Sequence, residues 1–170
     1  MAAAHAQERS STVTIDTQVL ALLEFVSGPI ATATFSFDAP IAFRELEAQG
    51  TEAVIRLPDP NTFDGSVFLC KKDVSKVEPK EWLEIPAETD WVEIPADGSA
   101  EGRGMGALDM ARAQRSGGKP RAAADLAIHV LDIMESIAAS AASGDTTPVS
   151  TTCTSSDLMP VGWNPLQRST

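Results

Sequence analysis

The sequence is poor in basic residues, and this shortage argues against two classes of partner. Thirteen Lys and Arg residues stand against 24 Asp and Glu residues, which gives a formal net charge of −11. Proteins that bind nucleic acid neutralise its phosphates with clustered cations, and the sequence holds no such cluster. The acidity also opposes binding to an anionic membrane surface. We therefore expect neither nucleic acid nor membrane among the partners.

Cysteine and long apolar runs are also scarce. Cys70 and Cys153 lie far apart and form no C-x-x-C motif, and isolated thiols are typical of a reduced cytosolic protein. No uninterrupted apolar run approaches the roughly 18 residues that a membrane span needs. Glu8 and Arg9 interrupt the N-terminus before a signal sequence forms. We expect a cytoplasmic protein that spans no membrane.

The composition is that of a globular protein. The chain has 170 residues, of which 43% are hydrophobic and 22% charged. A chain of this length forms a core without help from a disulfide or a metal. We predict one domain over residues 12–154, preceded by a disordered N-terminus at residues 1–11 and followed by a loosely held tail at residues 155–170.

Alternating apolar and polar residues predict β-strands in the first half of the chain. Ser27-Gly28-Pro29 and Gln49-Gly50-Thr51 interrupt this alternation, so each predicts the turn of a hairpin. A threonine-rich face at Thr32, Thr34 and Ser36 is then free for solvent or a second subunit. The predicted strands cover residues 12–16, 18–26, 30–37, 43–48, 52–57 and 66–71.

Helical periodicity replaces the alternation in the second half. It predicts a short helix over residues 105–115 and a longer one over residues 121–143, with Gly144 ending the second. Residues 148–153 predict one last strand. Hairpins followed by helices indicate an α+β fold, a mostly antiparallel open sheet with helices packed on one face.

The acidic segment between these halves contains a short repeat. Trp82-Leu83-Glu84-Ile85-Pro86-Ala87 recurs nine residues later as Trp91-Val92-Glu93-Ile94-Pro95-Ala96. Nine residues are too few for a solenoid unit. The repeat fits two similar edge strands whose carboxylates guard the edge, or an aromatic ligand clamp, and we favour the edge strands.

Two patterns resemble functional motifs. Residues 102–107 read Gly-x-Gly-x-x-Ala before a helix, but a polar loop precedes them and a second helix follows, so the βαβ unit of a dinucleotide site is missing. Asp125, His129 and Asp132 share one helix face. They fit a metal set, a histidine poised for proton transfer or a solvated or interface stripe, and we favour the stripe.

The sequence offers no convincing catalytic constellation. No serine lies in a Gly-x-Ser-x-Gly elbow, and neither cysteine lies beside a cationic group. A hydrolase or lyase would need paired carboxylates, and only the acidic segment could provide them. Runs of surface carboxylates usually serve only solubility, so this function is the weakest interpretation. We predict no catalytic residue, no metal ligand and no cofactor bound by this chain alone.

Read together, several segments resemble the C-terminal domain of Gfo/Idh/MocA-type oxidoreductases. They extend in order and spacing from about residue 12 to residue 153. The matching segments are Leu23-Glu24-Phe25, Gly28, Ile30-Ala31-Thr32, Ser36-Phe37-Asp38, Gly50-Thr51-Glu52, Ile55, Leu57-Pro58-Asp59-Pro60-Asn61, Phe63, Arg103-Gly104-Met105-Gly106, Asp109-Met110-Ala111, Arg115-Ser116-Gly117, Arg121-Ala122 and His129-Val130-Leu131-Asp132-Ile133-Met134-Glu135.

The resemblance implies a sheet with helices on one face and another subunit on the other. It also implies NAD or NADP in the complete enzyme and a substrate pocket bordered by residues 102–109. The candidate substrate-binding residues are Arg103, Asp109 and His129. For Arg103, a structural salt bridge fits the sequence as well as a substrate contact does. The family's Rossmann domain and its Glu-Lys-Pro lysine are absent, because Glu78-Pro79-Lys80 has another order and place.

Two functions follow from this resemblance. The chain is expected to be the substrate-binding and oligomerisation domain of a sugar or polyol dehydrogenase, as a fragment or split subunit that is inactive alone. A homo-oligomer formed through the open sheet face, and a separate Rossmann-fold subunit, are the expected partners. The alternative is a non-catalytic assembly or regulatory module that keeps only the dimerising sheet.

Overall fold

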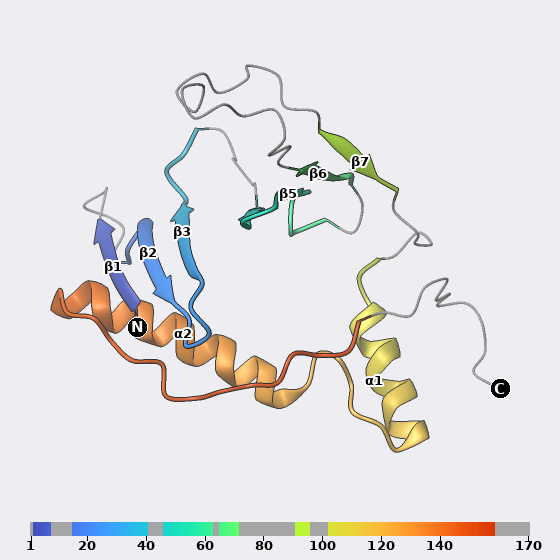
Figure 1. Ribbon diagram of the computed structural model, residues 1–170. Helices are drawn as coiled ribbons and strands as arrows, with labels where there is room; N and C mark the ends of the chain where they lie inside the picture. The colour runs from blue at the N-terminus through green and yellow to red at the C-terminus, as the bar shows by residue number, and fades with distance from the viewer. Residues whose placement is uncertain are drawn as a thin grey trace. The chain divides into compact units, whose positions relative to one another are not determined.

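The computed structural model describes residues 2–7, 15–40, 46–62, 65–71, 91–95 and 102–158 (Figure 1). The chain divides into two compact units. The first contains Met1–Ala42 and Asp109–Asp157, and the second contains Phe43–Leu108 and Leu158–Thr170. The single domain predicted over residues 12–154 stays a prediction. Among the described residues, the two predicted hairpins build separate sheets.

The first unit contains a three-stranded antiparallel sheet in the order β1-β2-β3 (Figure 1). Strands β2 (Gln18–Glu24) and β3 (Ile30–Ser36) form the predicted hairpin. Its turn is closed by the amide of Phe25, which donates to the carbonyl of Pro29 at 3.0 Å. The first hairpin is therefore confirmed.

Strand β1 (Ala2–Gln7) lies within the segment predicted as a disordered N-terminus, residues 1–11. Its six residues pair antiparallel with β2, from Ala2 opposite Leu23 to Gln7 opposite Gln18. The segment shows little alternation, so its sequence carried no strand signal. Its order comes from the open edge of β2, whose backbone groups need partners. Residues 8–14, and with them most of the strand predicted at residues 12–16, lie outside the described residues.

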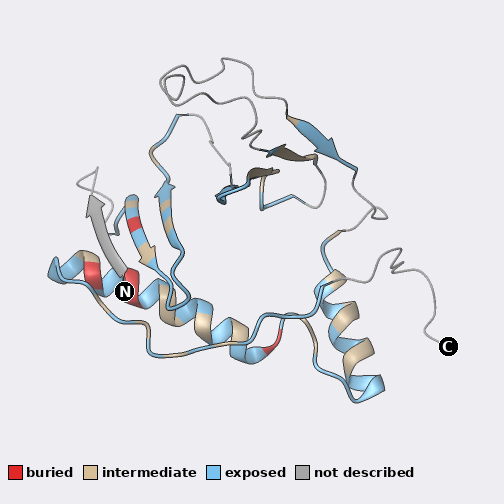
Figure 2. Ribbon diagram, viewed as in Figure 1, coloured by how far each residue is buried: buried red, intermediate tan, exposed pale blue. Residues whose placement is uncertain are grey.

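Helix α2 (Ala124–Ser143) covers one face of this sheet. Ala21 of β2 and Ile137 of α2 are buried against each other, and the buried positions of Figure 2 lie on these two elements and at Ala123. Val19, Leu23, Ala33 and Ile133 pack around that contact. An open antiparallel sheet with a helix on one face is an α+β fold, as the sequence predicted.

The other face of the same sheet is open. Because successive residues of a strand point to opposite faces, Leu20 and Leu22 lie opposite the α2 side, and they are 52% and 40% exposed. Their cross-strand partners are Thr34 and Thr32, which are also exposed. The predicted threonine-rich face therefore exists, and leucines alternate with its threonines across the hairpin.

Two helices follow close to the predicted bounds. Helix α1 covers Met105–Ser116, and α2 begins at Ala124, three residues later than predicted. The delay has a local cause, because Ala123 is extended with φ −80° and ψ 161°. Gly144 ends α2 in the left-handed conformation with φ 75°, and its amide donates to the carbonyl of Ser140 at 2.9 Å.

Among the described residues, α2 is the one helix whose length and apolar content would allow it to cross a membrane. It carries three carboxylates and His129, groups that are costly inside a bilayer. One side of it packs against the sheet, and 17% of its apolar window is buried. The helix is consistent with a soluble protein.

The second unit contains an antiparallel sheet in the order β4-β5-β6-β7. Strands β4 (Leu46–Gln49) and β5 (Ala53–Leu57) form the second predicted hairpin, and β6 (Val67–Lys71) matches the strand predicted at residues 66–71. Strand β7 (Val92–Ile94) belongs to the second copy of the tryptophan repeat and forms the edge of the sheet, as the edge-strand interpretation predicted. The first copy lies outside the described residues.

Candidate functional site

The three candidate substrate-binding residues have different surroundings. Arg103 is exposed in the turn that leads into α1 and belongs to the second unit. Asp109 on α1 and His129 on α2 belong to the first unit, where each is held by a different group of residues. Their role in substrate binding stays a prediction.

Asp109 is fastened to Arg121, a residue the sequence did not single out as functional. The Arg121 amide donates to Oδ2 of Asp109 at 2.8 Å, and the Arg121 guanidinium pairs with Oδ1. The Asp109 side chain is only 13% exposed. Both of its oxygens accept a hydrogen bond from Arg121. Arg121 forms a salt bridge with Asp109. The two roles considered for Arg103, a substrate contact and a structural salt bridge, stay predictions.

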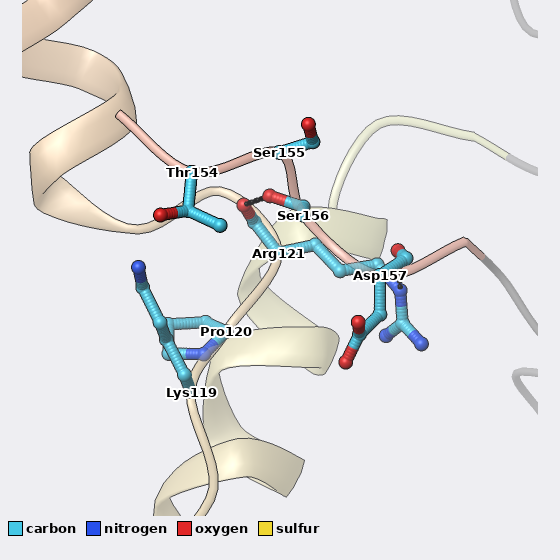
Figure 3. A pocket seen from close by; sticks show the side chains of 7 residues that line it. All are labelled: Lys119, Pro120, Arg121, Thr154, Ser155, Ser156 and Asp157. Atoms are coloured by element: carbon cyan, nitrogen blue, oxygen red, sulfur yellow. Dashed lines mark hydrogen bonds between the residues drawn. The ribbon is translucent and has the colours of Figure 1, made fainter. Parts of the chain in front are cut away.

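Arg121 also holds the segment that follows α2. Its Nε donates to the carbonyl of Asp157 at 3.2 Å, and the Ser156 hydroxyl donates to the Arg121 carbonyl, the contact drawn in Figure 3. These contacts border a pocket of about 250 Å³ with a polar lining of hydroxyl and charged groups. The lining residues are Lys119, Pro120, Arg121, Thr154, Ser155, Ser156 and Asp157.

His129 is joined to Asp132 through Thr151. The Thr151 hydroxyl donates to Oδ2 of Asp132 at 2.8 Å and lies 2.9 Å from Nδ1 of His129. A hydroxyl has one proton, and an ionised carboxylate only accepts, so the Thr151 oxygen must accept its second bond from Nδ1–H of His129. The neutral ring therefore carries its proton on Nδ1, which leaves Nε2 as the unprotonated nitrogen.

Asp132 accepts more bonds than this one. Its Oδ2 also accepts the amides of Thr151 and Ser150, at 2.7 and 2.9 Å, and the Ser150 hydroxyl at 3.1 Å. The hydrogen bonds from Thr151, followed by those from Ser150, hold the pKa of the Asp132 carboxyl below its ordinary value of 3.8, against the opposing effect of burial. Ser150 and Thr151 escaped the sequence analysis, because the pattern of residues 148–153 indicated a strand.

That last strand is a wrong prediction. Residues 148–153 follow an extended course without strand pairing. Pro148 has no N–H to offer a ladder, and the amides of Ser150 and Thr151 donate to the Asp132 carboxylate instead. The Asp132 side chain on α2 thus accepts the backbone amides that a neighbouring strand would otherwise bind.

The three residues predicted to share a helix face all lie on α2, but they have different partners. Asp125 pairs with Lys119 at 2.6 Å, and this hydrogen bond is the largest cause of its lowered pKa. His129 and Asp132 are joined through Thr151. In the part of the chain that the structure describes, no group of three potential ligands could hold a metal ion. The stripe thus holds neighbouring segments in place, which differs from a purely solvated surface.

In the second unit, Trp91 has a cationic neighbour. The Arg56 guanidinium lies 4.5 Å from the centre of the Trp91 ring, and its Nη2 pairs with Glu47 at 3.2 Å. Hydrogen bonds from Gln49 and then Arg56 lower the pKa of Glu47. One ring face of Trp91 is therefore occupied by Arg56, which does not favour the ligand-clamp interpretation.

No model of a known protein family and no curated protein matches this chain.

Proposed function

We propose that this chain is a cytoplasmic substrate-binding and oligomerisation domain of a Gfo/Idh/MocA-type sugar or polyol oxidoreductase. NAD or NADP, and the residues that transfer the proton, come from a Rossmann-fold partner, so the chain alone is inactive. The proposal rests on the ordered set of matching segments in the sequence and on one structural observation, the open face of the β1-β2-β3 sheet.

The open face supports oligomerisation through its composition. Leu20, Leu22 and Ile30 on this face are 52%, 40% and 66% exposed, although α2 covers the opposite face. Exposed apolar groups that gather on one face commonly mark an interaction surface. Thr32 and Thr34 alternate with the leucines across the hairpin and provide hydroxyls for polar contacts. A second copy packed on this face would bury the leucines.

The need for a partner is supported by the chain around α1. The glycines of residues 102–106 lead into α1, but the next element is α2. A dinucleotide site needs a strand that delivers the glycine turn and a parallel strand that follows the helix. The glycine loop therefore does not complete a βαβ unit, and we place the nicotinamide on the partner.

The alternative function, a non-catalytic assembly module, is favoured by the candidate substrate residues. Asp109 is held by Arg121, and His129 is held by Thr151, so both already have partners within the chain. A gene beside this one that encodes a nucleotide-binding domain would support the oxidoreductase. Its absence would support the assembly module.

The first experiment measures the oligomeric state by size-exclusion chromatography with light scattering. We expect a dimer or a larger assembly. Leu20→Lys should convert it to a monomer, because it places a charge on the sheet face that the second copy would bury. Leu46→Lys is the matched control, since Leu46 is 50% exposed on β4 of the other sheet. A wild-type monomer at high concentration would contradict both functions.

A further inference from the structure

The segment after α2 is held in an unusual way. Residues 145–157, here called the strap, form neither a helix nor a paired strand, apart from a single bridge at Thr147. Extended chain normally gains its order from a ladder of backbone hydrogen bonds. Besides this bridge, side chains hold the strap at three separate places.

The middle of the strap is held by one carboxylate oxygen. Oδ2 of Asp132 accepts two consecutive amides and two hydroxyls, all from Ser150 and Thr151, at 2.7 to 3.1 Å. Consecutive amides that converge on one anion form a small binding concavity. Here the anion is a side chain of α2, so its charge attaches the strap to the helix.

The two ends of the strap have other attachments. At its start, the Ser140 hydroxyl donates to the carbonyl of Asp145 at 2.7 Å. At its end, Arg121 binds the carbonyl of Asp157 at 3.2 Å, and the Ser156 hydroxyl binds Arg121. Neither attachment involves Asp132. Of the three attachments, only the one at Ser150 and Thr151 depends on Asp132.

Among the residues whose side chains the structure describes, Ser150 and Thr151 are the main support of the Asp132 carboxylate. On α2 the nearest titratable groups are His129, which reaches it through Thr151, exposed Glu135 one turn later and Asp125, which is paired with Lys119. The titratable groups of the strap are Asp145, Cys153 and Asp157. The described residues of β2 and β3 that pack toward α2 are apolar, namely Val19, Ala21, Leu23 and Ala33.

We propose that the strap can detach from α2 and that the ionised Asp132 carboxylate is the group that keeps its middle attached. Protonating this carboxyl frees Ser150 and Thr151 from α2, while α2 and the sheet remain folded. This device needs no substrate or cofactor, so it holds or fails independently of the proposed function.

The direction of the pH dependence follows from Asp132. Its pKa is lowered in the folded chain, so its contribution is fully present above the ordinary value of 3.8 and is lost as pH falls through the lower, folded pKa. The strap should stay attached from neutral pH down to about pH 4 and be released in stronger acid.

The test is NMR-detected hydrogen exchange at the amides of Ser150 and Thr151, expressed as protection relative to the unstructured chain at the same pH. Asp132→Ala should reduce this protection at neutral pH by at least about tenfold, because it removes a charged acceptor. Asp132→Asn keeps an accepting oxygen but cannot lose a charge. It should retain part of the protection and show no loss in acid.

Asp125→Asn is the matched control, since it neutralises a carboxylate of the same helix that binds Lys119 rather than the strap. It should leave protection at Ser150 and Thr151 unchanged and preserve the loss in acid. Unchanged protection in Asp132→Ala, or an acid response that persists in Asp132→Asn, would overturn the proposal. So would an equal loss of protection along α2, because the carboxylate would then support the fold as a whole.

Discussion

At the scale of single residues, two aspartates of α2 show how context assigns a role to the same side chain. Asp125 lies in the first turn and pairs with Lys119, and both side chains are largely exposed, at 44% and 60%. Exposed pairs of this kind contribute little to stability. Asp132, seven residues later, accepts four hydrogen bonds from a segment 18 and 19 residues away in sequence. Only the second aspartate joins distant parts of the chain.

His129 gives a prediction at this scale. Because Thr151 donates to Asp132, the neutral ring should carry its proton on Nδ1, which is the rarer tautomer in solution. Heteronuclear NMR that correlates ring nitrogens with ring protons should show this tautomer in the wild type. Thr151→Val removes the acceptor and should shift the ring toward the Nε2–H form, whereas Thr151→Ser should restore Nδ1–H. An Nε2–H ring in the wild type would contradict the assigned hydrogen bonds.

At the scale of elements, the sequence predicted both hairpins and both helices because their signals are local. Alternation and turn residues lie within each hairpin, and helical periodicity with Gly144 marks α2. Strand β1 and the strap were missed for the opposite reason. The order of β1 comes from the edge of β2, and the order of the strap comes from Asp132 and Arg121. Neither partner can be identified from a pattern within the segment itself.

The contact between α2 and the sheet gives a prediction at this scale. Ile137→Ala should lower the free energy of unfolding by about 2–4 kcal/mol, because Ile137 is 9% exposed and packs on Ala21. Ile128→Ala is the matched control on the same helix. Ile128 is 56% exposed, so its loss should cost no more than about 0.5 kcal/mol. Denaturant unfolding followed by circular dichroism measures both, and equal effects would contradict the described packing.

At the scale of the whole molecule, the candidate site was only partly accessible to the sequence. The pattern placed Asp125, His129 and Asp132 on one helix face, but it gave no sign of Ser150, Thr151 or Lys119 as their partners. It drew attention to Asp109 without Arg121, which lies 12 residues later and fastens it. Side-chain contacts of this range depend on how helices and loops pack, and one sequence carries little information about that packing.

The open sheet face and the uncompleted glycine loop together give the chain its proposed place in a larger enzyme. In the enzyme that we propose, the apolar and hydroxyl-bearing face would bind a second copy, and a nucleotide-binding partner would carry out the oxidoreductase chemistry. The chain would supply this face and the candidate substrate residues Arg103, Asp109 and His129. This distribution of roles makes a prediction about what the purified chain does by itself.

The most direct measurement is the reduction of NAD and NADP by the purified 170-residue chain with a panel of sugars and polyols. The assay is run alone and again after adding a nucleotide-binding domain encoded beside its gene. We predict no reduction by the chain alone and reduction by the mixture, because the chain provides only the substrate side of the site. Turnover by the chain alone, or none from a mixture whose two proteins bind each other, would contradict this account.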